Sequence, residues 1–204
     1  SSSAQNTSLI AHELGHTLGM GHAGVAQCSG AAWNDIPQRE NIHSYTGDET
    51  CGSRTYADPF GFMGRKMAKG KSHSGAVDKE AWGWLREDED APHRIERIEE
   101  DGTYVLNSLS EEHEHGIKAL KVPHGQNKWL YVEYRTLMNQ DGTSTYDQGL
   151  LDAHLNPYHR VLESSNLFSG ALLHIGRPSA FGTTTSLLFD GLVDDQDVSL
   201  SRPL

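Results

Sequence analysis

The chain has 204 residues, of which 36% are hydrophobic and 22% are charged, with a formal net charge of −11 at pH 7. This size suits one sizeable domain or two small ones, and no apolar run of about 18 residues occurs that would span a membrane. The 17 basic residues are scattered through an acidic chain, so nucleic acid is not expected as a partner. No signal peptide is visible in the first ten residues.

A helix is expected near the beginning of the chain, starting at Asn6 or Thr7, either of which could cap it. Within it, His12 and His16 are four residues apart, so their rings lie on one face about one turn from each other. Two imidazole nitrogens at that separation can reach one metal ion at about 2.0–2.1 Å. Three apolar residues of this helix are expected to face the core: Ile10, Leu14 and Leu18.

The residues that follow His16 predict a third metal ligand. Gly19 tolerates the left-handed conformation that ends a helix, and the turn then brings His22 back toward the ion. Gly15 is less favourable in a helix than alanine by up to about 1 kcal/mol, which indicates that another part of the chain packs closely there. Glu13 is next to the first ligand and can reach a water on the ion without binding the ion itself.

Three protein ligands leave one position for water, and zinc lowers the pKa of such a water from 15.7 to about 7. Glu13 is expected to take the proton, direct the hydroxide onto a carbonyl and pass the proton to the leaving amine. The alternative is a structural zinc site, but such a site fills four positions with Cys and His, and no fourth ligand lies nearby at a suitable spacing. The pattern favours one catalytic zinc and hydrolysis of peptide bonds.

The two cysteines, Cys28 and Cys51, lie in a stretch rich in Gly, Ser, Asn and Asp that is expected to be a loop. A disulfide that closes this loop is one interpretation, and two free thiols are the other. A disulfide would indicate an extracellular compartment.

The remaining elements follow in chain order. A second helix is expected around HSGAVDKEAWGWL, and the acidic stretch 86–101 is expected to be a linker that enters an edge strand. After it come five short alternating runs, typical of antiparallel strands: TYVLNSL, GIKALKV, KWLYVEYR, GALLHIG and TTSLLFDGL. This predicts an α+β protein with a catalytic subdomain at 1–85 and a small β-sandwich at 102–204.

HELGHTLGMGH resembles the zinc signature of the metzincin metallopeptidases, in which a methionine-bearing turn lies beneath the zinc. YADPFGFMGR resembles that turn, with Met63 as its methionine and as a packed support, not a ligand. The two segments together look most like the gametolysin family of secreted zinc endopeptidases. The resemblance implies a polypeptide or glycoprotein substrate, one catalytic zinc and an extracellular location.

The later part of the chain resembles secreted metallopeptidases of the immune inhibitor A type, in AWGWL, WLYVEYR, GALLHI and LLFD. These resemblances imply the lower half of a metzincin catalytic domain followed by the β-sandwich. The upper half of that domain binds extended substrate at a strand edge. Only eleven residues precede His12, so this upper half is expected to be on another chain, in a preceding segment or lost.

Two further patterns have alternative interpretations. The acidic run DGLVDDQD, residues 190–197, offers oxygens suitable for calcium but lacks the spacing of a calcium-binding loop, so a solvated surface is the alternative. Trp82, Trp84 and Trp129 are expected to pack in the core, with a sugar-binding platform as the alternative.

Two functions follow from these expectations. The first is a secreted zinc endopeptidase that uses Glu13 as general base. The second is a binding or assembly module, stabilised by zinc, that lacks the substrate cleft and cleaves nothing; it predicts exposed apolar surface around the first helix.

Overall fold

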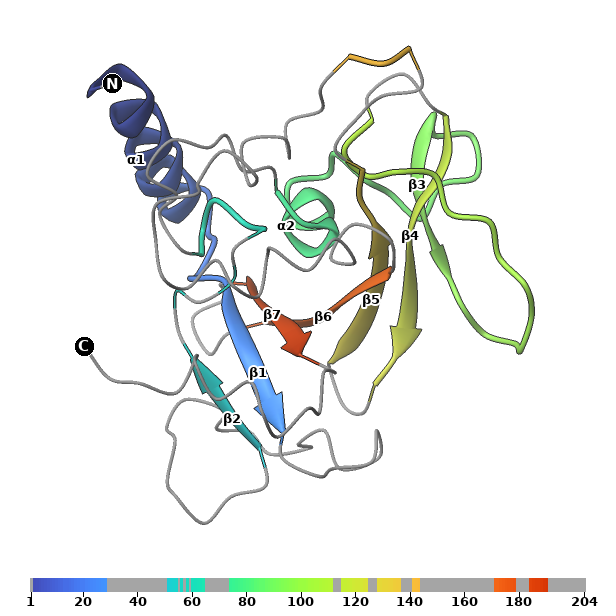
Figure 1. Ribbon diagram of the computed structural model, residues 1–204. Coiled ribbons are helices and arrows are strands. Elements are labelled where there is room, and N and C mark those ends of the chain that lie inside the picture. Colours follow the sequence, from blue (N-terminus) through green and yellow to red (C-terminus); the bar gives the residue numbers. More distant parts are fainter. Residues whose placement is uncertain are drawn as a thin grey trace.

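In the residues that it describes, the computed structural model contains a mixed β-sheet and two helices (Figure 1). It describes residues 2–28, 51–54, 56, 58, 60–64, 74–111, 115–124, 128–136, 141–143, 171–178 and 184–190. The helices are α1 (Ser2–Thr17) and α2 (Ala76–Ala81). The strands are β1 (Gly24–Cys28), β2 (Cys51–Arg54), β3 (His93–Arg97), β4 (Gly116–Pro123), β5 (Trp129–Tyr134), β6 (Ala171–Pro178) and β7 (Thr184–Asp190). The expected α+β class is confirmed.

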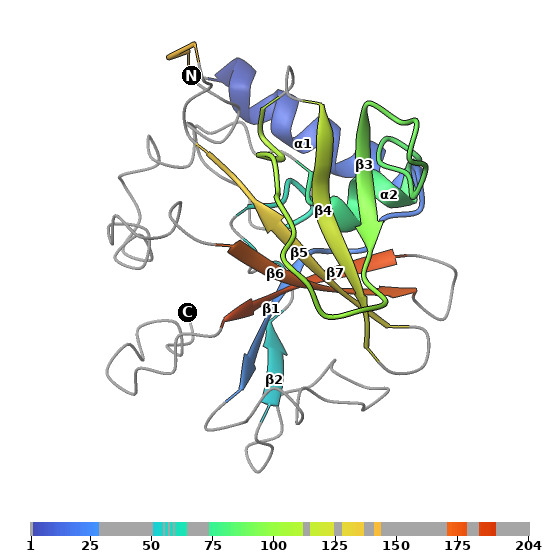
Figure 2. The same cartoon turned by 90° about the vertical axis from the view of Figure 1, so that its right-hand side faces the viewer.

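The described strands form one sheet in the order β2-β1-β7-β6-β5-β4-β3. β1 is parallel to β7 and β3 is parallel to β4, whereas the other neighbouring pairs are antiparallel. Figure 2 shows the β1–β2 pair at the end of the molecule opposite the two helices. The sheet is therefore mixed and continuous through the described parts of the chain.

This sheet differs from the expected division into a catalytic subdomain and a separate β-sandwich. β1 and β2 come from the region 1–85, and β1 pairs with β7 from the region 102–204. The alternation of side chains predicts that a segment is a strand, but it does not predict which strand it pairs with. Pairing depends on which strands have unpaired backbone N–H and C=O groups along one edge, and here β7 pairs with β1 along such an edge.

Four of the five expected later strands are present as β4, β5, β6 and β7. The expectation that 86–101 is a linker was wrong for its middle part, because the backbone there pairs with β4 and forms the edge strand β3. The run TYVLNSL forms no regular strand. Instead, single backbone bonds attach it to its neighbours, from Asn107 N to the Ile117 carbonyl and from Leu109 N to the Tyr134 carbonyl.

α2 packs on the sheet through β5, β6 and β7 (Figure 1). The apolar core beneath it consists of Ala76, Val77, Leu85, Ile95, Leu109, Ala119 and Tyr131. Burial of a large apolar side chain contributes about 1.5–3 kcal/mol. At the rim, Glu80 of α2 accepts a hydrogen bond from the Tyr131 hydroxyl and pairs with Lys121 Nζ at 2.6 Å. Trp129 packs against this core as expected, whereas Trp84 is exposed.

α1 differs from the expectation in two ways. It begins at Ser2, so Asn6 and Thr7 lie inside the helix. The apolar stripe expected in the core, Ile10, Leu14 and Leu18, is exposed by 53% to 66%. The reason is that α1 docks through its small residue Gly15, where an added Cβ would lie 2.3 Å from Met63 Sδ. Close packing at Gly15, expected from the sequence, is confirmed.

Candidate metal centre

Three histidines converge at the end of α1. The Nδ1 or Nε2 atoms of His12, His16 and His22 all lie within 4.8 Å of one another, and each ring is partly buried. Within the described residues this is the one group of three or more His, Cys, Asp or Glu side chains so arranged. The group could hold a metal ion.

Two backbone carbonyls fix the tautomers of the helical pair. His12 Nδ1 lies 2.9 Å from the Phe62 carbonyl, and His16 Nδ1 lies 2.9 Å from the Met20 carbonyl. Because a carbonyl oxygen only accepts, each Nδ1 must carry the hydrogen, so each Nε2 of the neutral ring has a free lone pair. In metalloproteins, a histidine that binds a metal through one ring nitrogen commonly donates the hydrogen of its other nitrogen in this way, which fixes the orientation of the ring.

The chain reverses after the helix as its glycines predict. Gly19 has φ +87°, in the left-handed region, and the Met20 amide donates to the Gly15 carbonyl at 3.0 Å. The reversal directs the following residues back toward α1. It therefore brings His22, which is not on the helix, into contact with the rings of His12 and His16.

The turn at residues 60–64 supports both parts of the group. The Phe62 carbonyl accepts the hydrogen bond from His12, and the Met63 carbonyl accepts one from the Ala23 amide at 2.9 Å. Met63 is fully buried with Met20 and Ala23. Two consecutive carbonyls thus fix a ligand candidate on the helix and the residue beside His22 in the loop.

The surroundings of His22 favour the neutral form of its imidazole. The pKa of His22 is lowered, first by partial burial and then by the positive charges that His16 and His12 carry when protonated. The carboxylate of Glu13 acts in the opposite direction, which places its charge within reach of this ring. Glu13 is itself exposed to solvent. The group therefore combines a His22 ring that favours its neutral, metal-binding form with one nearby carboxylate.

A buried charged cluster, missed from the sequence, lies behind the turn. His174 Nε2 donates to Asp58 Oδ2 at 3.3 Å, and Arg135 Nε donates to Glu133 Oε1 at 2.7 Å. Arg135 also donates to the Phe60 carbonyl at 2.9 Å, at the beginning of the turn. Its members are all buried: Asp58, Asp78, Glu133, Arg135 and His174. The one available sequence signal was the placement of Glu133 and Arg135 on the same strand face as Tyr131.

The ionisation of this cluster is mutually dependent. Burial and then the Asp58 carboxylate raise the pKa of Asp78 to about 7. Burial opposes charge on Glu133 and on His174, but Arg135 and His174 lower the pKa of Glu133, and the Glu133 carboxylate raises the pKa of His174. Glu133 is thus driven toward its charged form and His174 toward its protonated form, whereas Asp78 is driven toward its neutral form.

The remaining expected sites fall largely outside the described residues. The backbone of Cys28 lies directly opposite that of Cys51 in the β1–β2 ladder, so both belong to strands and not to a loop. Opposite residues have Cβ atoms about 4.5–5.5 Å apart, close to the 3.5–4.5 Å of a disulfide. Their side chains are not among those described, and the disulfide stays a prediction. The acidic run 190–197, considered for calcium, is described only for the backbone of Asp190.

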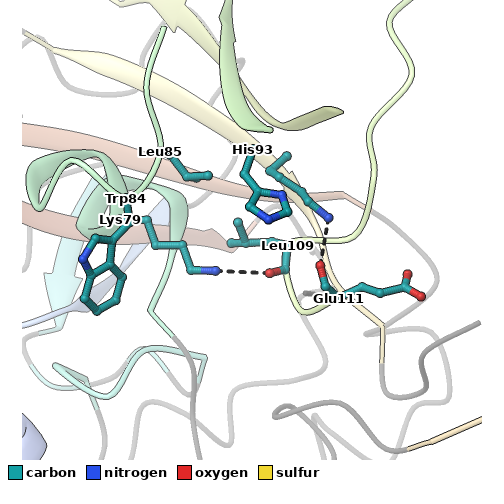
Figure 3. Close-up of a pocket in the computed structure, with 7 residues that line it drawn as sticks. Lys79, Trp84, Leu85, His93, Leu109 and Glu111 are labelled. Carbon is teal, nitrogen blue, oxygen red and sulfur yellow. Dashed lines mark hydrogen bonds between the residues drawn. The ribbon is translucent and has the colours of Figure 1, made fainter. Parts of the chain in front are cut away.

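A cavity of about 170 Å³ is lined by a different set of residues (Figure 3). The ammonium group of Lys79 donates to the Leu109 carbonyl at 3.2 Å. Lys118 Nζ donates to the carbonyls of Ser108 and Glu111, both at 2.9 Å. The rest of the lining is Trp84, Leu85 and His93. These bonds assign the two buried lysines a structural role, holding an irregular segment against α2 and β4.

Comparison of the chain with protein-family models, with curated proteins and with solved structures finds no match. Within the described residues, no helix is both long and apolar enough to cross a lipid bilayer. The class of site is therefore given by its own residues, and it is a three-histidine centre able to hold a metal ion.

Proposed function

We propose that this chain is a secreted, zinc-dependent endopeptidase of the metzincin type. The observation that carries the proposal is the pair of Nδ1 bonds from His12 and His16 to backbone carbonyls, which leaves two Nε2 lone pairs beside His22. The resemblance of HELGHTLGMGH and YADPFGFMGR to the gametolysin family supports zinc as the metal and a polypeptide or glycoprotein as the substrate. In this proposal α1 and the turn at 60–64 belong to the lower half of a metzincin catalytic domain.

The three imidazoles suit zinc, because three neutral histidines plus one open position form a known catalytic ligand set. When bound, zinc lowers the pKa of a water molecule and polarises the carbonyl to be cleaved. Glu13, exposed beside His12, accepts the water proton on its carboxylate and later gives a proton to the leaving amine. The carbonyls of Phe62 and Met20 keep His12 and His16 in the tautomer that presents Nε2 outward.

Zinc content and cleavage of an unfolded protein, measured with and without a chelator, test this proposal. We expect one zinc per chain and cleavage that the chelator abolishes. Glu13→Ala and Glu13→Gln should keep the zinc, because the carboxylate is not a ligand, yet lose at least about 100-fold in cleavage rate, as removal of a general base predicts. His16→Ala is the matched control that should lose the zinc as well.

The outcomes separate the parts of the proposal. Normal turnover by Glu13→Ala would contradict the assigned mechanism. Absence of zinc from the wild-type chain would contradict the metal centre itself.

A second candidate function is favoured by the exposed apolar side of α1. Leu9, Ile10, Leu14 and Leu18 are all large apolar residues that face solvent, and contiguous exposed apolar surface commonly marks an interaction site. In this alternative the chain is a zinc-stabilised binding or assembly module that lacks a substrate cleft. One zinc per chain with no cleavage of any substrate would favour it, particularly if Ile10→Glu abolished association with a partner and left the zinc in place.

A further inference from the structure

Tyr56 has a backbone conformation that its side chain does not favour. Its φ is +62°, and it is the one non-glycine residue with positive φ among the described residues. A residue with a Cβ is disfavoured in the left-handed region, and for a bulky aromatic residue the conformation is unusual. Such conformations persist where surrounding contacts enforce them, and they cluster at functional sites.

Burial of the side chain does not explain this conformation, because Tyr56 is 46% exposed. Among the described residues, the contacts that the structure gives its ring are with the histidine group. The centroid of the ring lies 3.6 Å from that of His22, with the planes tilted by 37°, and 6.0 Å from that of His12, with the planes 15° apart. The strained backbone thus places an aromatic ring directly against two of the candidate metal ligands.

His22 is the ligand candidate that most needs such a contact. His12 and His16 are on a helix, and hydrogen bonds to carbonyls fix the orientation of both rings. His22 is on the segment that joins α1 to β1, and the contacts that the structure gives its ring, within the described residues, are aromatic ones with His12, His16 and Tyr56. Of the three rings, that of Tyr56 lies closest to His22, at 3.6 Å between centroids against 4.7 Å for His16 and 5.4 Å for His12.

We propose that Tyr56 is a positioning residue of the metal centre: its ring sets the orientation of the His22 imidazole, and the strained backbone is what holds the ring there. This inference rests on the proposed metal centre but not on peptidase activity. The ring face makes the contact, so the hydroxyl group is dispensable for this role. A glycine at position 56 removes the ring and also tolerates positive φ without strain.

Substitution by glycine is expected to affect stability and zinc affinity differently, and this difference distinguishes a positioning role from a structural one. A residue that only stabilised the fold would lower the unfolding temperature when truncated. Tyr56→Gly is expected to leave the unfolding temperature of the metal-free protein unchanged or raised. It should nevertheless weaken zinc binding by about 10–100-fold, the range observed when residues that orient metal ligands are removed.

The experiment measures zinc affinity by competition with a chromogenic chelator for the full chain and three variants. Tyr56→Phe keeps the ring and should bind zinc within about twofold of wild type. Tyr56→Gly and Tyr56→Asn lose the ring, and both residues tolerate the left-handed region, so both should lose affinity; Asn provides a second folded variant should glycine loosen the turn. Thermal unfolding in excess chelator gives the accompanying stability of each metal-free form.

Three results would overturn the inference. Wild-type affinity in both Tyr56→Gly and Tyr56→Asn would show that the ring does not position His22. An equal loss in Tyr56→Phe would assign the effect to the hydroxyl group and not to the ring. A wild-type chain that binds no zinc would overturn the metal centre and this inference together, whereas a chain that binds zinc without cleaving protein would leave the inference intact.

Discussion

The histidine group and the buried charged cluster both consist of ionisable side chains, but they differ in burial and in how far apart their residues are in the sequence. The three histidines lie within eleven consecutive residues and are only partly buried. The cluster of Asp58, Asp78, Glu133, Arg135 and His174 comes from four separate segments, and His174 and Asp58, which are bonded to each other, are 116 positions apart. The comparison shows that the candidate metal ligands are local in sequence, while the groups that support them are distant.

The two regions meet at the turn of residues 60–64. Arg135 donates to the carbonyl of Phe60, whereas the carbonyls of Phe62 and Met63 bind His12 and Ala23. The charged cluster therefore fixes one end of the turn, and the other end fixes the ligand candidates. Side chains that bind a metal must be held to within about 0.5 Å. We infer that the sheet holds the turn through Arg135, and that the turn holds the histidine group in place.

The largest change in stability is expected when one charge of the buried cluster is removed. Glu133→Ala leaves Arg135 and His174 without their shared carboxylate and the Ala76 amide without its acceptor. Removing one partner of a buried ion pair destabilises a protein by about 3–5 kcal/mol. We expect a loss of this size in the free energy of unfolding, measured by urea denaturation in excess chelator.

The matched control is Glu99→Ala, which breaks the pair with Arg97 on the protein surface, where Glu99 is 72% exposed. An exposed pair contributes about 0–1 kcal/mol. If Glu133→Ala and Glu99→Ala had equal effects, the cluster would not be the support described here. Glu133→Gln keeps the size and the acceptor for Ala76, and provides a milder variant should Glu133→Ala fail to fold.

The pH dependence of stability offers a second test of the cluster. The pKa of Asp78 is about 7 in the folded protein against 3.8 for an unperturbed group. The folded protein therefore keeps a proton that the unfolded chain has lost, so this group lowers the free energy of unfolding as pH rises from about 4 to 7. Asp78→Asn carries no titrating proton. Its stability relative to wild type should rise over this window, by roughly 4 kcal/mol at most, given 1.36 kcal/mol per pKa unit.

Urea denaturation of both proteins at several pH values, in excess chelator, measures this difference. His174, whose pKa is raised, also loses stabilisation as pH rises from about 6.5 through its folded pKa, and Glu133, whose pKa is lowered, loses stabilisation as pH falls from about 4.5 through its folded pKa. These groups, together with Asp58 and Arg135, are present in both proteins. Parallel pH profiles for wild type and Asp78→Asn would contradict the assignment of the slope to Asp78.

The sequence predicted the histidine group because its geometry depends on local rules. A four-residue spacing puts His12 and His16 on one face, and the glycine at position 19 allows the reversal. The strands β4 to β7 were predicted for the same reason, since alternation is a property of neighbouring residues. What could not be predicted is pairing: nothing within β1 or β7 indicates that the two are partners.

The charged cluster was not predictable because local polarity gives the wrong answer there. In β5 and after it, Glu133 and Arg135 share a face with Tyr131, and charged residues are seldom fully buried unless they are paired. Their compensation comes from His174 and Asp58, far away in sequence. The apolar stripe of α1 gave the converse error, since its residues were expected to be buried and are exposed. Apolar residues favour burial, but the helix docks through Gly15 because only a residue without a Cβ admits Met63 so closely.

The contact of α1 with Met63 provides the last test, with the smallest expected effect. Two opposing contributions decide whether Gly15→Ala raises or lowers the stability of the protein. Gly15→Ala improves helix propensity by up to about 1 kcal/mol, yet its Cβ would lie 2.3 Å from Met63 Sδ and 3.0 Å from Phe62. Overpacking costs about 1–3 kcal/mol, so we expect a net loss of up to about 2 kcal/mol in urea denaturation and weaker zinc binding as His12 moves away from the Phe62 carbonyl.

Met63→Ala provides the control, because it removes the atom that the new methyl group would meet. The double variant Gly15→Ala with Met63→Ala should lose less stability than the sum of the two single losses, as expected for residues in direct contact. Strict additivity, or a Gly15→Ala variant more stable than wild type, would mean that α1 does not rest on the turn. The histidines and the charged cluster would then be independent, since the contact of α1 with that turn is what links them.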